Sequence, residues 1–240
     1  MAEKPAASKT HTLTFMGTAA GCGVPSFFCD CPACTEAREN PVLARGDCGI
    51  MIRGVADGEG HVPTLIVDTP PDARHQLLRE GIRRVDEILF THAHFDHIGG
   101  LGEYEYLVQK RQMPTYGSKT ALEGILSEFH FMDYCLDAHV IEPFETHEFD
   151  GVRYTACPVT HAPGTYGYLI ETDGTKMFYA SDTARLPKET AERVRGCDIL
   201  AMDATFWKRN WSPNDHHSVQ ECIEEGLELE AGTIYLTHMC

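Results

Sequence analysis

The sequence predicts an α/β domain of layered sheets and helices. Short apolar runs typical of buried strands recur along the chain, and in its second half they alternate with amphipathic helical segments. Several of these runs end directly before a histidine or an aspartate, as Leu89 and Phe90 do before Thr91 and His92. Polar side chains at the carboxyl ends of strands are typical of active-site loops in α/β folds.

Strands are expected wherever a short run is rich in valine, isoleucine or aromatic residues. In chain order these runs are 11–16, 48–53, 64–68, 86–90, 153–157, 166–171, 176–180, 199–203 and 233–236. The glycine-containing segments 57–60 and 172–175 are typical of hairpin turns.

Helices are expected over residues 71–80, 120–129, 187–195 and 218–229. Pro187 stands at a first helical turn, Gly81 and Gly196 follow predicted helix ends, and Ser218 is a good N-cap. Residues 1–9 are small and polar and are expected to be flexible, whereas residues 10–240 are expected to form one domain, because no linker interrupts them.

Composition limits the function classes. The chain has 240 residues and a formal net charge of −16, which repels nucleic acid on average, so no nucleic-acid partner is expected. No apolar stretch is long enough to span a membrane and no secretory signal is visible, so no membrane partner is expected. Ten scattered cysteines without such a signal favour a reducing, cytoplasmic location.

The segment 91–97, Thr-His-Ala-His-Phe-Asp-His, indicates a metal centre. His92 and His94 are two residues apart and point the same way in an extended chain, whereas Asp96 and His97 follow where the chain turns. Imidazole nitrogen and carboxylate oxygen suit zinc, manganese and iron, and two ions about 4 Å apart can hold a hydroxide between them. A surface histidine cluster is the alternative, which the regular spacing and the preceding strand oppose.

This HxHxDH pattern resembles the signature of the metallo-β-lactamase superfamily. The resemblance implies an αββα sandwich, in which two packed mixed sheets carry helices on their outer faces. It also implies three later ligands, each at the end of an apolar run. By resemblance, one ion is held by His92, His94 and His161, the other by Asp96, His97 and His238, and Asp182 bridges the two.

Two further aspartates follow apolar strands. Asp68 is expected to brace the metal loop by hydrogen bonding, as in the resembled fold, and Asp203 to orient a ligand.

A cysteine cluster near the start narrows the resemblance to the PhnP-type branch of phosphodiesterases. Cys29, Cys31 and Cys34 offer three thiolates to one structural zinc, the alternative being three unligated thiols. In that branch the fourth ligand is a histidine at the equivalent of position 241. Cys240, Cys22, water or a residue outside this sequence are therefore left open as the fourth ligand.

The branch implies hydrolysis of a small, cyclic, phosphoribosyl-type phosphodiester by a hydroxide between two divalent ions, manganese or zinc and alternatively iron. Asp96 is expected to serve catalysis as well as hold an ion, and His216 to protonate the leaving alkoxide, with His217 as the rival. The partner is a small phosphorylated substrate, and a homodimer is implied by resemblance alone. A PqqB-like role in cofactor biosynthesis and a ribonuclease Z-like nuclease are the alternatives.

Overall fold

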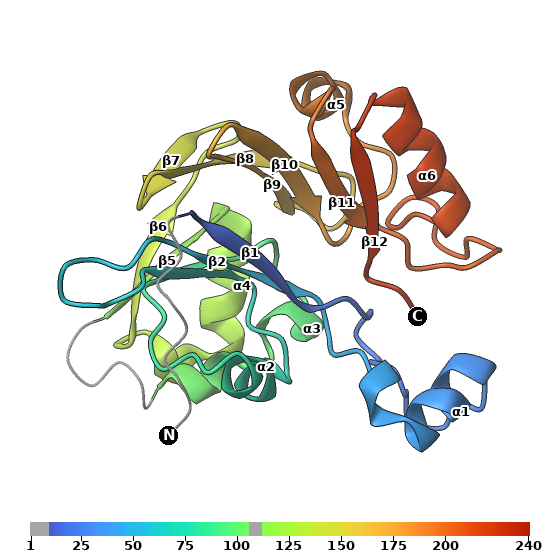
Figure 1. The fold of residues 1–240 in the computed structure, drawn as a ribbon, viewed down its shortest axis with the longest axis horizontal. Coiled ribbons are helices and arrows are strands. Elements are labelled where there is room, and N and C mark those ends of the chain that lie inside the picture. The colour runs from blue at the N-terminus through green and yellow to red at the C-terminus, as the bar shows by residue number, and fades with distance from the viewer. Residues whose placement is uncertain (1–9, 106–111) are drawn as a thin grey trace.

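Two six-stranded sheets pack face to face with helices on their outer faces (Figure 1). This is a computed structural model, and it describes residues 10–105 and 112–240. The layering confirms the predicted αββα sandwich. The expected flexibility of residues 1–9 concerns residues outside the described ranges.

The first sheet contains the first six strands in chain order. β1–β2 and β2–β3 are antiparallel, and every later pair is parallel. The loop that joins β2 to β3 contains the predicted turn at 57–60. The strands are β1 (Thr12–Gly17), β2 (Gly49–Arg53), β3 (Thr64–Val67), β4 (Glu87–Leu89), β5 (Met113–Gly117) and β6 (Leu136–Val140).

The second sheet contains the last six strands, ordered β12-β11-β10-β9-β8-β7. The pairs from β7 to β10 are antiparallel, whereas β10–β11 and β11–β12 are parallel. The strands are β7 (Thr146–Phe149), β8 (Val152–Pro158), β9 (Tyr166–Thr172), β10 (Thr175–Ala180), β11 (Ile199–Asp203) and β12 (Thr233–Thr237).

All four predicted helices are confirmed, with their ends within two residues of the expected positions. α2 (Ala73–Arg79) and α4 (Lys119–Glu128) cover the first sheet, and α5 (Lys188–Val194) and α6 (Val219–Glu228) cover the second (Figure 1). α1 (Pro32–Glu39) lies outside these layers, and α3 (Phe95–Ile98) lies within the metal loop. Single 3-10 turns are η1 (Pro41–Leu43), η2 (Leu101–Tyr104) and η3 (His130–Met132).

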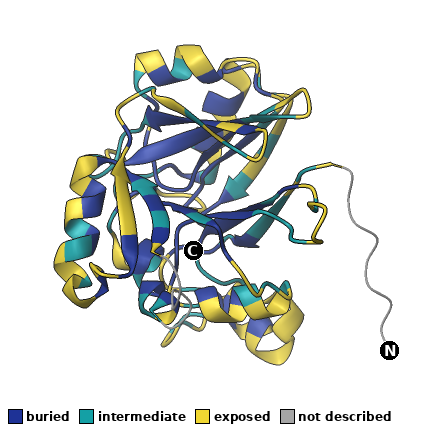
Figure 2. Cartoon of the chain, turned by 90° about the vertical axis from the view of Figure 1, so that its left-hand side faces the viewer, coloured by how far each residue is buried: buried dark blue, intermediate teal, exposed yellow. Residues whose placement is uncertain are grey.

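Three apolar layers hold the sandwich together. Alternation along β2 sends Ile50 and Ile52 between the sheets and Met51 toward the helices of the first sheet. On the other side, Phe178 and Leu200 pack under α5 and α6. Figure 2 shows the result, with buried sheets inside and exposed residues on the outer faces of the helices.

This topology concentrates loops at one edge of the sandwich. β3 and β4 run parallel, as do β10, β11 and β12, and antiparallel pairing through β9 gives β8 the same direction as β10. The polar residues that follow these strands therefore meet at their carboxyl ends. Within residues 10–105 and 112–240, no helix has the length and apolarity to cross a bilayer.

Candidate metal centre

The metal loop is held to the end of β3 by a buried aspartate. Asp68 has a left-handed backbone, with φ of 67°, that turns its carboxylate toward the loop after β4. That carboxylate accepts hydrogen bonds from Thr91 N and Oγ1, both at 2.9 Å, and lies 2.7 Å from His97 Nδ1. Nε2 of His97 is thereby turned toward the centre. Asp68 thus contacts the loop as its predicted bracing role requires.

The first predicted ligand group comes together at the ends of β4 and β8. Ring nitrogens of His92, His94 and His161 lie within 4.8 Å of one another. His94 Nδ1 and His161 Nε2 are 3.2 Å apart, and His161 Nδ1 is 2.9 Å from the carbonyl oxygen of Asp215. This backbone contact fixes the imidazole of His161 with Nε2 facing the other two histidines.

The second predicted group joins the metal loop to the end of β12. Donor atoms of Asp96, His97 and His238 also lie within 4.8 Å of one another. Asp96 Oδ2 is 3.3 Å from His238 Nε2 and 3.6 Å from His97 Nε2. Short α3 makes this possible, because it begins after His94 and carries Asp96 and His97 on consecutive positions of one turn.

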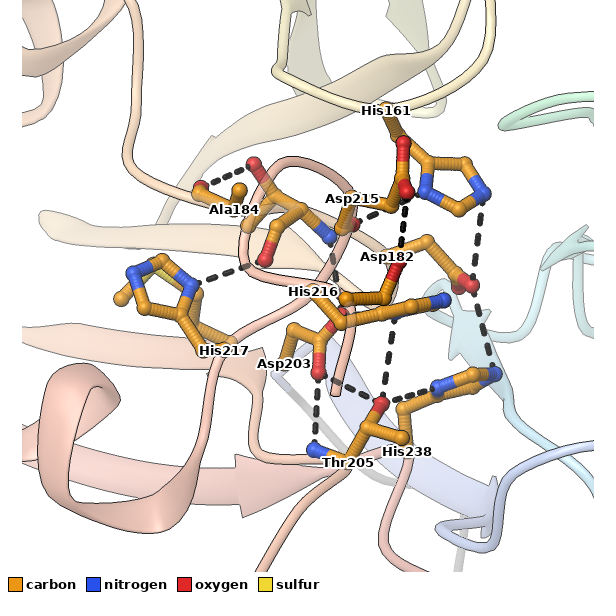
Figure 3. A network of polar contacts seen from close by, with 12 residues as sticks. His161, Asp182, Ala184, Asp203, Thr205, Asp215, His216, His217 and His238 are labelled. Carbon is orange, nitrogen blue, oxygen red and sulfur yellow. Dashed lines mark hydrogen bonds and ion pairs between the residues drawn. The ribbon is translucent and has the colours of Figure 1, made fainter. Parts of the chain in front are cut away.

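Asp182 lies between the two groups. One carboxylate oxygen, Oδ1, is 3.0 Å from His97 Nε2, and the other, Oδ2, is 3.3 Å from His238 Nε2 and 3.9 Å from His161 Nε2. Figure 3 shows the carboxylate between His161 and His238. A single buried carboxylate that reaches both groups has the placement that bridging two cations requires.

Asp203 and Thr205 form an outer layer behind the second group. Asp203 is fully buried and accepts hydrogen bonds from Thr183 N at 3.0 Å and from Thr205 N and Oγ1 at 2.8 and 2.7 Å. Thr205 Oγ1 in turn lies 2.8 Å from His238 Nδ1 (Figure 3). Asp203 therefore reaches His238 through Thr205, which is how ligand imidazoles are commonly oriented. Thr205 was not predicted from the sequence.

The two adjacent histidines before α6 have different surroundings. His216 lies at the centre, with Nδ1 2.7 Å from Asp203 Oδ2 and its ring 4.8 Å from that of His161. His217 points away and is buried, with Nδ1 2.8 Å from the Thr183 carbonyl and Nε2 2.8 Å from Glu225. His217 neither caps α6 nor faces solvent, contrary to the two roles considered for it from the sequence. The cap is Ser218, which forms a capping box with Glu221.

The electrostatics of the centre favour cations and neutral imidazoles. Burial and the neighbouring His97 hold the pKa of His92 well below its usual value, and burial with His161 lowers that of His94. His97 and Asp182 form a buried pair, and burial disfavours the charged form of each. The negative charges of Asp182 and Asp68 outweigh this effect at His97 and raise its pKa. Likewise, His238 and His97 hold the pKa of Asp182 well below its usual value despite burial. A field that stabilises a proton on His97 Nε2 stabilises any cation placed there.

These residues fit a pair of divalent ions. Within the described ranges, the buried atom His92 Nε2 has no hydrogen-bond partner, and the buried atoms His97 Nε2 and Asp182 Oδ1, which are 3.0 Å apart, form no well-aligned hydrogen bond. These three donor atoms lie within 4.8 Å of one another, and a bound cation would satisfy all of them. Nitrogen and carboxylate oxygen donors suit zinc, manganese or iron.

The cysteine cluster lies in the separate lobe that contains α1. The sulfur atoms of Cys29, Cys31 and Cys34 lie within 4.8 Å of one another, a spacing that fits one tetrahedral ion. Cys31 also caps α1, because its sulfur accepts from Cys34 N at 3.5 Å. Cys22 and Cys240 are paired with each other, 3.9 Å between sulfurs, so neither joins the three thiols as a fourth donor in this conformation.

Two further contacts escaped the sequence analysis. His238 has a left-handed backbone, with φ of 55°, and its amide donates to Cys48 Sγ at 3.1 Å. Gly21 lies so close to Asp96 that a Cβ atom would stand 2.7 Å from the aspartate side chain. Neither position carries a local signal, because each depends on a segment distant in sequence.

Comparison with known proteins identifies the fold family. Residues 64–239, well over half of the chain, match the beta-lactamase superfamily domain. A solved structure described as a new diphosphatase from the PhnP family superposes with a TM-score of 0.82 at 29% identity. The match covers 95% of this chain and 86% of that one.

Two relatives of similar sequence have names that differ from that of the PhnP-family diphosphatase. An octanoyltransferase of Porphyromonas gingivalis is 29% identical over 235 residues, which cover 93% of this chain but only 45% of that protein. The chain thus spans less than half the length of that relative. The coenzyme PQQ synthesis protein B of Methylobacterium radiotolerans is 27% identical over 224 residues, 80% of this chain and 72% of that protein.

Proposed function

The chain belongs to the beta-lactamase superfamily, and we propose that it is a di-metal phosphodiesterase acting on a small phosphorylated substrate. The proposal is carried by one observation: seven histidine and aspartate side chains from the loops of both sheets converge, with His216 beside them. The likeness to a PhnP-family diphosphatase supports phosphoryl chemistry. A cyclic, phosphoribosyl-type diester is the substrate that the PhnP-type sequence features favour.

The ligand sets follow from the geometry. His92, His94 and His161 would hold one ion, Asp96, His97 and His238 the other, and Asp182 would contact both. When bound, such a pair of ions supplies an activated water and neutralises charge on the phosphoryl oxygens. Manganese, zinc and iron all suit these donors, and the three cysteines would hold a structural zinc.

His216 would supply the proton for the leaving oxygen. Asp203 holds Nδ1 at 2.7 Å, which fixes the ring and leaves Nε2 for the substrate. The ring stacks on His238 with 5.4 Å between centroids and lies 4.8 Å from the ring of His161, so it stands beside the ligand cluster. An alkoxide with a high pKa leaves slowly as an anion, and proton transfer from a positioned imidazole contributes about 10²- to 10⁴-fold in rate.

The test compares two neighbouring histidines. With manganese added, the purified protein should hydrolyse bis(p-nitrophenyl) phosphate or a cyclic phosphodiester. His216→Ala should lower kcat by about 10²-fold or more while the ion content stays unchanged. His217→Gln, the matched control, removes a buried contact to Glu225 and should reduce stability with little loss of kcat at permissive temperature. Full activity of His216→Ala with bound ions would remove His216 as the acid.

A PqqB-like role is the second candidate, because the similarity to coenzyme PQQ synthesis protein B covers 80% of the chain. The same ligand set would then hold a redox-active ion for oxidative chemistry. Protein that is inert toward all phosphodiesters but shows an iron signal by electron paramagnetic resonance would favour this reading. A ribonuclease Z-like role is disfavoured by the net charge of −16, and a gel shift with transfer RNA tests it.

A further inference from the structure

Two exposed thiols from opposite ends of the sequence lie side by side. Cys22 follows β1 and Cys240 follows β12, and their sulfur atoms are 3.9 Å apart. Backbone contacts fix this pairing. Ala19 and Met239 form a parallel bridge, with Met239 N donating to Thr18 O at 3.0 Å. The thiols are therefore held in register by the fold.

The two segments that carry these thiols lead directly to the second ligand group. Gly21 precedes Cys22 and packs on Asp96 with no room for a Cβ atom. His238 stands two residues before Cys240, and the amide of Cys240 donates to Thr205 O at 3.3 Å. A change in the separation of these segments thus reaches Asp96 on one side and His238 on the other.

We propose that Cys22 and Cys240 form a reversible disulfide that clasps the two segments over the second ion site. The disulfide follows from thiol spacing alone, whereas its effect on ion release rests on the metal centre proposed above. To form the bond, the sulfurs of these two exposed side chains must approach from 3.9 Å to about 2.05 Å.

The oxidant is a small disulfide such as oxidised glutathione. The thiolate of Cys22 attacks one sulfur of glutathione disulfide, which forms a mixed disulfide and releases one glutathione. The thiol of Cys240, after losing its proton to water, then attacks the Cys22 sulfur and releases the second glutathione. Overall two protein thiols are oxidised and one glutathione disulfide is reduced to two thiols.

Other cysteines are poorly placed to compete. Cys48, Cys135, Cys157, Cys197 and Cys222 are buried. Cys29, Cys31 and Cys34 are grouped with one another and would be protected by a bound zinc. With zinc bound to that cluster, Cys22 and Cys240 are the exposed thiols that remain for oxidation.

Peptide mapping tests the cross-link. Full-length protein loaded with zinc is equilibrated with oxidised and reduced glutathione, alkylated and digested with chymotrypsin. Cleavage after Phe27 and Phe28 separates Cys22 from the other three cysteines of that segment. We expect one disulfide-linked pair, Cys22 with Cys240, that is absent from Cys22→Ser and Cys240→Ser. Oxidation confined to Cys29, Cys31 and Cys34, or no linked peptide, would overturn the proposal.

Ion release tests the clasp. In the presence of excess chelator, the oxidised wild-type protein should lose one of its two exchangeable ions several-fold more slowly than the reduced protein. The reduced Cys22→Ser protein, as control, should match the reduced wild type. Equal rates with the disulfide present would refute the clasp. Protein that binds no ions would refute the metal centre instead, and peptide mapping would still decide the disulfide.

Discussion

Replacement of Asp68 by asparagine isolates the charge that braces the metal loop. The fully buried carboxylate contacts Thr91 N, Thr91 Oγ1 and His97 Nδ1 at 2.7–2.9 Å. Asparagine has nearly the same shape and tolerates the left-handed backbone at φ of 67°. Asp68→Asn therefore removes the negative charge and one acceptor, and adds no backbone strain.

The expected cost follows from these contacts. A hydrogen bond to a charged group contributes about 1.5–3 kcal/mol, and breaking a buried ion pair costs about 3–5 kcal/mol. Thr91 N contacts Oδ1, whereas Thr91 Oγ1 and His97 Nδ1 both contact Oδ2, so the remaining amide oxygen keeps at most two of the three bonds. We therefore expect the free energy of unfolding at pH 7 to fall by about 3 kcal/mol. His97 also loses the partner that orients its ring, and the second ion should bind about 10- to 100-fold more weakly.

Urea denaturation followed by circular dichroism measures the free energy of unfolding, and titration with manganese measures the affinity for the second ion. Asp150→Asn is the matched control, because Asp150 also has a left-handed backbone but is partly exposed and accepts from Val55 N at 3.2 Å. Its free energy of unfolding should change by less than about 1 kcal/mol. If Asp68→Asn lowers the free energy of unfolding by no more than Asp150→Asn does, and the ion affinity is unchanged, Asp68 does not brace the centre.

Three further outcomes are expected. Gly21→Ala should displace Asp96 and lower the ion content measured by mass spectrometry. Gly58→Ala is the control and should leave the ion content unchanged, because a Cβ atom there meets nothing within 4 Å. Equal ion contents in the two variants would contradict the close packing of Gly21 on Asp96. Burial lowers the pKa of His11, but hydrogen bonds to Asp173 and the Asp150 carbonyl outweigh it and raise the pKa overall. His11→Gln should therefore lower the stability of the folded protein below the ordinary histidine pKa of 6.5, and this loss should disappear as the pH rises above the folded pKa of His11. A pH-independent difference in thermal stability would exclude the ionic contribution. Removal of ions by a chelator should lower the melting temperature, because ions at 100 times their Kd add about 2.7 kcal/mol to folded-state stability; an unchanged melting temperature would argue against bound ions.

The sequence predicted strands best where both faces of a sheet are covered. β10 and β11 are almost wholly buried, and their apolar runs are unmistakable. β6 and β7 were missed because they are edge strands that bury little: β6 has one buried residue, Leu136, and β7 has none. β5 was missed because Pro114 and Gly117 interrupt its pattern.

At the site, too, some features could be predicted from the sequence and others could not. The segment 91–97 stood out by its own spacing, whereas His161, Asp182 and His238 were assigned through the resemblance to the metallo-β-lactamase superfamily, since a single histidine or aspartate after a strand is a weak signal. The fold brings the ends of those strands together. The different environments of His216 and His217 could not be predicted, because they depend on Asp203 in β11 and Glu225 in α6. α1 was missed because its first turn lies within the cysteine cluster, where thiol spacing was the dominant signal.

Backbone strain at the ends of β3 and β12 links folding to ion binding. Asp68 and His238 both adopt left-handed conformations, with φ of 67° and 55°, and such residues cost about 1–3 kcal/mol each. At Asp68 the hydrogen bonds to Thr91 and His97 offset the strain. At His238 only two polar contacts with described residues lie outside the ligand cluster: the amide donates to Cys48 Sγ at 3.1 Å, and Nδ1 lies 2.8 Å from Thr205 Oγ1. Its Nε2 faces the carboxylates of Asp96 and Asp182, both at 3.3 Å, which are themselves proposed ion ligands.

The end of β12 should therefore be the more labile side of the centre. An ion bound by Asp96, His97 and His238 would stabilise this strained turn, and a more stable turn would in turn hold the ion more tightly. Cys48→Ser, which keeps a hydrogen-bond acceptor, should retain this coupling, whereas Cys48→Ala should lose ion affinity and thermal stability together. If Cys48→Ala lost ion affinity without thermal stability, or thermal stability without ion affinity, the strain at His238 would be relieved by other contacts.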